Sequence, residues 1–127
     1  MTKVELNKST CILLEKGVIN VIYKNNVEIE LEDVIEIRKV TLQMSEGNPY
    51  VAIYESGEQT IVTKEAREIP MIDDTIKNRK ALAIIMNNLP QRIIINFFIR
   101  TNKKSHPIKA FTSKTEALKW AKQFLKN

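Results

Sequence analysis

The sequence predicts an α/β domain with a mixed sheet that is mostly parallel at its centre and covered by helices. Two short apolar segments, 10–14 and 18–23, open the chain as strands of a hairpin. After residue 30, segments of helical period alternate with short apolar strands. The run 81–86 is apolar throughout, as expected for a central strand covered on both faces. The predicted element order is ββαβαβαβα.

Length and composition fit one soluble domain spanning residues 1–127. The chain is 43% hydrophobic and 28% charged, and no internal repeat or linker divides it. Its single cysteine, Cys11, lies in the run Cys-Ile-Leu-Leu, which predicts a buried small hydrophobe. The sequence opens with no pattern typical of a signal peptide, and no apolar run approaches the roughly 20 residues that span a bilayer. We therefore expect a cytoplasmic protein.

The first half of the chain carries clear turn and cap signals. Gly17 can take the positive φ that a tight hairpin turn needs. Apolar residues recur at helical spacing from Leu31 until Glu-Gly-Asn-Pro at 46–49 ends that helix, and residues 50–54 read as a short buried strand. Thr63 is a suitable N-cap for a helix that Pro70 should end or kink.

The second half continues the alternation. Asn88 can cap a helix over 89–101, with Pro90 in its first turn. Residues 108–111 form a last strand, and the capping box Ser-Lys-Thr-Glu at 113–116 begins a final helix.

The helix 89–101 carries more apolar surface than one domain core requires. On a helical wheel, Arg92 and Arg100 share a narrow stripe with Asn96, while the apolar residues cover about 240°. A helix packed on a sheet needs an apolar stripe only somewhat over 100° wide. The surplus predicts a face for a second subunit, an apolar ligand or a lipid surface, with these candidate residues: Ile94, Phe97 and Phe98. We expect a homodimer, the commonest way to cover such a face.

Charge is segregated along the chain. Residues 89–127 contain nine basic residues and one acidic residue, a net charge of +8, whereas the remainder carries −3. A basic third suggests either an anionic partner or a solvated lysine-rich surface. The candidate contacts to an anionic lipid are Arg92, Arg100, Lys103 and Lys104. Nucleic acid is disfavoured because the aromatic residues of this third fall at core-like helical positions.

The sequence contains no recognisable catalytic or metal-binding motif. His106 is the only histidine and lies in a basic loop, where we expect it to be solvated. No thiolate or imidazole cluster is available for a usual zinc site, so we expect neither a metal nor a cofactor. A glycine-rich phosphate loop and a nucleophile elbow are both missing, which disfavours an enzyme.

Two short motifs carry a resemblance to a known family. Thr-Lys-Glu-Ala-Arg at 63–67 and Phe-Thr-Ser-x-x-Glu-Ala-Leu-x-Trp at 111–120, together with the element order, resemble STAS domains. These form the fold of bacterial anti-sigma-factor antagonists. The motifs are more closely similar to an uncharacterised family of short bacterial STAS-like proteins, which have also been likened to CRAL-TRIO lipid carriers.

The resemblance implies two alternative functions. The first is a regulatory module that binds a protein partner around the helix start, through Thr63, Lys64 and Arg67. In the antagonists a phosphorylated Ser or Thr at this junction is followed by Ser-Gly, whereas here Lys64 and Glu65 follow, so we favour a capping role for Thr63. The second function is a carrier of an apolar ligand or a binder of anionic lipid. On sequence alone we favour the first.

Overall fold

A computed structural model describes residues 2–72, 77–86, 88–101 and 106–125, and it contains a six-stranded mixed sheet. The strand order is β1-β2-β3-β5-β7-β8. Pairing is antiparallel from β1 to β3 and parallel from β3 to β8, which confirms the predicted mixed sheet with a parallel centre. The strands are β1 (Lys3–Glu5), β2 (Ser9–Glu15), β3 (Val18–Tyr23), β5 (Tyr50–Glu55), β7 (Arg79–Ile85) and β8 (Ile108–Phe111).

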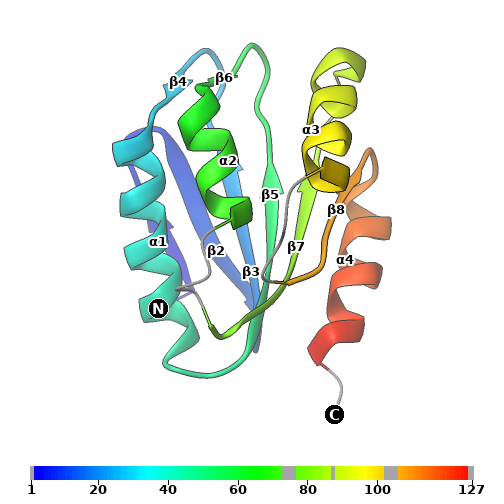
Figure 1. Ribbon diagram of the computed structural model, residues 1–127. Helices are drawn as coiled ribbons and strands as arrows, with labels where there is room; N and C mark the ends of the chain where they lie inside the picture. Colours follow the sequence, from blue (N-terminus) through cyan, green and yellow to red (C-terminus); the bar gives the residue numbers. More distant parts are fainter. Residues whose placement is uncertain (1, 73–76, 87, 102–105, 126–127) are drawn as a thin grey trace.

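Helices cover both faces of this sheet (Figure 1). Each of the first three helices connects two successive parallel strands, and all three pack on the same face, as right-handed crossovers between consecutive strands require. Packing of the fourth helix covers the opposite face. The helices are α1 (Leu31–Ser45), α2 (Lys64–Ile72), α3 (Leu89–Thr101) and α4 (Lys114–Lys122), with a 3₁₀ turn at Gln123–Leu125.

Three strands were not predicted because they are too short to show a period. Besides β1, they are β4 (Glu28–Ile29) and β6 (Ile61–Val62), which pair in parallel as a separate two-stranded sheet at the top of Figure 1. This pair joins the segments that lead into α1 and α2. As a result, Thr63 follows β6 rather than the central strand β5.

The predicted turn signals are confirmed, with one exception. Gly17 has φ = 79° in the hairpin, and the C-cap Glu46 takes the left-handed conformation at φ = 51°. The exception is Pro70, which does not end α2, because this helix continues to Ile72. Proline fixes φ near the helical value, so a proline close to the end of a helix is compatible with one further half turn of backbone.

The core is divided by the sheet into two layers. The larger layer lies between the sheet and α1, α2 and α3, and it includes Cys11, Ile37 and Ile95. The smaller layer packs Ala117 and Ala121 of α4 against the other face. The buried position predicted for the cysteine is confirmed, and burial raises the pKa of its thiol to about 11, so the thiol stays protonated.

A candidate ligand pocket between α2 and α3

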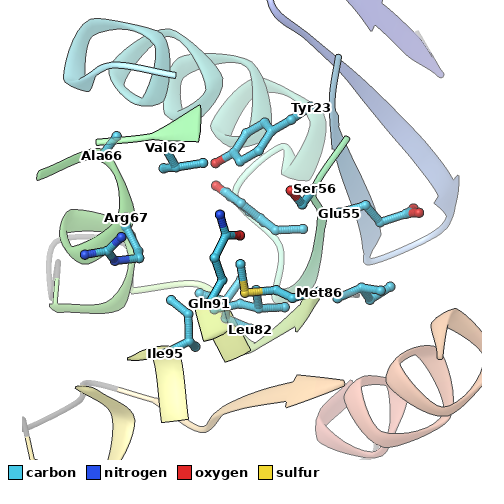
Figure 2. Close-up of a pocket in the computed structure, with 13 residues that line it drawn as sticks. Tyr23, Glu55, Ser56, Val62, Ala66, Arg67, Leu82, Met86, Gln91 and Ile95 are labelled. Carbon is cyan, nitrogen blue, oxygen red and sulfur yellow. The ribbon is translucent and has the colours of Figure 1, made fainter. Parts of the chain in front are cut away.

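An apolar pocket opens at the carboxyl ends of β3, β5 and β7, between α2 and α3 (Figure 2). We call it the α2–α3 pocket. Its cavity volume is about 60 Å³, which is below the roughly 300–1,000 Å³ of typical small-molecule sites. In open α/β sheets, ligand sites lie beyond the carboxyl ends of the strands. The position of the pocket, rather than its size, is therefore that of a ligand site.

The inner surface of the pocket is provided by the central strands. Tyr23 ends β3, Tyr54 lies near the end of β5, and Leu82 and Met86 come from β7 and the residue after it. The two tyrosine rings meet edge to face, with centroids 6.0 Å apart. Burial raises the pKa of Tyr54 to about 12 and that of Tyr23 well above its ordinary value of 10. Both hydroxyls are therefore neutral at physiological pH.

The walls come from two helices and the short strand β6. Val62 and Ala66 lie on the β6 and α2 side, and Ile95 faces them from α3. The α2 wall begins at Thr63, whose Oγ1 accepts a hydrogen bond from the Ala66 amide at 3.2 Å. The predicted capping contact is thus present. Opposite it, Asn88 Oδ1 accepts from the Gln91 amide at 3.1 Å and caps α3 as predicted.

Besides Tyr54, Glu55 and Ser56, three polar side chains line this mostly apolar pocket: Tyr23, Arg67 and Gln91. The Tyr23 side chain is largely buried, with 7% of the residue exposed, and Arg67 and Gln91 are half-buried. Within the described part of the chain, none of the three side chains makes a hydrogen bond or an ion pair. In Figure 2, Arg67 lies on the α2 side and Gln91 on the α3 side of the pocket. The pocket therefore combines an apolar lining with a few unused polar groups, as ligand sites do.

The sequence prediction identified only part of this site. Of the residues assigned to a partner surface at the start of α2, Arg67 lines the pocket, while Lys64 is exposed outside it. The tyrosines were missed because they belong to strands whose apolar pattern shows burial but not a neighbouring gap. A signal was available in the two tyrosines that lie at or next to the ends of neighbouring parallel strands, since such strand ends meet at one edge of the sheet.

The outer face of α3 is apolar and exposed, as the wheel predicted. Ile94 is 48% exposed and Phe97 60%, and Leu89 and Ile93 accompany them. The assignment of Phe98 to this face was wrong, because its side chain is half-buried and packs against the larger core layer. The register of the helix turns Phe98 towards the sheet, next to the fully buried Ile95, which lies three residues earlier on the same side.

The basic residues of the predicted anionic contact are only partly described. Arg92 is half-buried and Arg100 is exposed on α3, whereas Lys103 and Lys104 lie outside the described residues. The anionic contact stays a prediction.

The solvated position expected for His106 was wrong. Its Nε2 accepts a hydrogen bond from Arg79 Nε at 3.0 Å, and Arg79 is only 3% exposed. Burial, together with the neighbouring guanidinium charge, lowers the pKa of this imidazole to about 4. The histidine is therefore a neutral partner of the buried Arg79. This arginine is the first residue of β7, so the pair lies at the end of the strand opposite the pocket.

Within the described ranges, no three acidic, histidine or cysteine side chains come together in a way that could hold a metal ion. Nor does any helix in the described segments have the length and apolar character needed to cross a membrane.

The arrangement of helices and strands is that of a STAS domain. A solved structure of an uncharacterised protein from the DUF3478 family of Shewanella loihica PV-4, described as having a SpoIIAA-like fold, superposes with a TM-score of 0.56. The match covers 95% of this chain and 99% of that one at 18% sequence identity, and it establishes the fold alone. The predicted STAS-like fold is confirmed.

Within this fold class, the chain belongs to the family described as Domain of unknown function (DUF7793), whose model matches residues 12–125. No curated protein matches the chain.

Proposed function

We propose that this protein is a non-enzymatic binding module of the STAS type, whose α2–α3 pocket takes an apolar small molecule. The observation that carries the proposal is the position of an apolar pocket at the carboxyl ends of three parallel strands. Its lining offers buried apolar surface from Val62, Leu82 and Ile95, and neutral tyrosine rings. Each Å² of apolar ligand surface removed from water there contributes roughly 25 cal/mol.

This proposal reverses the preference drawn from sequence, where a protein-docking role was favoured. The start of α2 offers a capping threonine, which needs no regulatory role to explain it. The pocket, by contrast, leaves apolar space and polar side chains that no internal contact of the described chain uses.

Two tryptophan substitutions on neighbouring residues of β6 test the proposal. Val62 faces the pocket, whereas Ile61 is 60% exposed outside it. We expect Val62→Trp to fill the pocket and weaken the binding of 1-octanol at least tenfold, measured by isothermal titration calorimetry. Ile61→Trp adds the same ring outside and should leave the affinity within twofold. Equal binding by the two variants, or no binding of 1-octanol by the wild type, would contradict the proposal.

A second candidate function rests on a different observation, the exposed apolar face of α3 formed by Leu89, Ile93, Ile94 and Phe97. A protein-interaction module would use this face to bind a partner, and a second copy of the chain is the simplest one. Light scattering over a dilution series tests that form of the function. A dimer that Phe97→Asp dissociates would support it, and a monomer at all concentrations would exclude it.

A further inference from the structure

We infer that the ligand of the α2–α3 pocket is a carboxylic acid, bound as its carboxylate beside Arg67 with its apolar body between α2 and α3. The inference rests on the proposed function and adds the chemical class of the ligand. It is carried by one cation and two hydrogen-bonding side chains that have no partner among the described residues and that lie beside the apolar side chains of the lining.

The charge of the site comes from Arg67. This residue is half-buried on α2, one turn after the helix cap, and no carboxylate of the described chain pairs with it. A guanidinium beside an apolar lining is partly removed from water, and a neighbouring anion compensates that loss. Because its planar fork matches a carboxylate, arginine is well suited to hold one through two parallel hydrogen bonds.

Two further polar groups line the same pocket. The Tyr23 hydroxyl and the Gln91 side-chain amide can each donate a hydrogen bond, and neither donates one within the described residues. Tyr23 is the more deeply buried residue of the two, with 7% of it exposed. Figure 2 shows its oxygen directed between the strands and α2, on the same side of the pocket as Val62.

The acidic side chain among the described lining residues does not face Arg67. Glu55 is the one acid among the described lining residues, and its Oε2 pairs with Lys114 Nζ at 2.9 Å. In Figure 2 the carboxylate of Glu55 is directed away from Arg67. The net charge at the pocket is therefore that of a single cation.

A single cation selects a monoanion. A phosphate dianion would retain one uncompensated charge beside the apolar lining, which is unfavourable where water is excluded. A carboxylate carries one charge and two acceptor oxygens, matching one guanidinium with the neutral donors of Tyr23 and Gln91. The apolar body of the acid then lies against Ala66, Leu82 and Ile95.

Octanoate and 1-octanol, which have the same chain length and differ in charge, test the inference by isothermal titration calorimetry at pH 7.5. We expect the wild type to bind octanoate at least tenfold more tightly than 1-octanol. Arg67→Gln should abolish this preference, so that the variant binds octanoate no more tightly than it binds 1-octanol. Since the Arg67 side chain makes no hydrogen bond or ion pair within the described chain, the variant should fold, and a thermal melt verifies that it does.

Lys39→Gln is the matched control, because it removes one positive charge from an exposed position on the outside of α1. It should retain the full preference for octanoate. Equal affinities of the wild type for acid and alcohol, or a preference that survives Arg67→Gln, would overturn the inference. If 1-octanol binds and octanoate does not bind more tightly, the inferred ligand class fails and the proposed pocket function stands. If neither compound binds, both fail.

Discussion

The start of α1 and the α2–α3 pocket lie at the same edge of the sheet, but they differ in whether their polar side chains have hydrogen-bond partners within the described chain. At α1, Glu30 and Asp33 form a reciprocal capping box, and the Glu30 amide donates to Asp33 Oδ2 at 2.8 Å. Lys8 Nζ donates to the same carboxylate oxygen at 3.2 Å and to the Glu28 carbonyl at 2.8 Å. At the pocket, the side chains of Tyr23 and Arg67 make no such bond within the described chain.

This difference distinguishes polar groups that stabilise the fold from polar groups that are available to a ligand. A polar group whose partners lie within the protein contributes to folding, and its removal leaves those partners unpaired. A polar group without an internal partner contributes little to folding and is available to a ligand. Local departures from full hydrogen bonding are therefore expected at functional sites.

The largest effect should follow from breaking the α1 cluster. Asp33→Ala removes the acceptor of the Glu30 amide and the ionic partner of Lys8, and it should lower the free energy of unfolding by about 2 kcal/mol. Urea denaturation measures this loss. Glu32→Ala is the control, because Glu32 is an exposed acid of the same helical turn, and it should change stability by less than about 0.5 kcal/mol. Equal losses in the two variants would show that the cluster is not what stabilises this edge.

Acid should reveal a second internally satisfied pair, Arg79 and His106. The folded-state pKa of His106 is about 4, below its ordinary value of 6.5, so the unfolded chain binds the proton more readily. The contribution is fully present above pH 6.5 and is lost as the pH falls towards 4. Because solvent screens a half-buried ring, we expect a loss of about 1.5 kcal/mol rather than the full value of the shift.

Urea denaturation at a series of pH values measures that loss. His106→Asn keeps a hydrogen-bond acceptor for Arg79 and cannot be protonated in this range. The variant should show a shallower fall between pH 6.5 and 4 than the wild type. Identical slopes would mean that His106 is not the group that titrates.

A smaller effect is expected at the cap that begins the pocket wall. Thr63→Ala removes the acceptor of the Ala66 amide and should lower the free energy of unfolding by about 1 kcal/mol. Thr63→Asp should be nearly neutral because aspartate also caps a helix. Denaturant melts of the two variants distinguish these outcomes. Equal, large losses would refute a simple capping role.

The smallest effect on stability is expected at the pocket itself. Tyr23→Phe removes a hydroxyl that makes no hydrogen bond within the described chain and keeps the ring that meets Tyr54. The free energy of unfolding should change by less than about 0.5 kcal/mol, measured by urea denaturation. A loss above about 1 kcal/mol would indicate an internal partner for this hydroxyl and would remove the contrast with the α1 cluster.

The fold could be predicted from sequence more fully than the site. Each long element carries its own period and caps, as at Asn88 and Ser113, so the element order follows from local pattern. The pocket depends on how β3, β5, β7, α2 and α3 are placed in space, and no local pattern records a gap between two helices. The solvated position predicted for His106 was wrong for the same reason, since its partner Arg79 lies 27 residues away in the sequence. The wheel found the apolar excess of α3 but placed Phe98 on the wrong side.

A ¹H–¹⁵N NMR titration of the wild-type protein with 1-octanol tests the central claim most directly, because it reports both regions in one experiment. The account predicts saturable shifts of the backbone amides of Ala66, Gln91 and Ile95, which line the pocket. The amides of Asp33 and Val34, at the start of α1, should not move. Shifts centred on α1, or confined to exposed residues of α3 such as Ile93 and Phe97, would contradict a ligand site between α2 and α3.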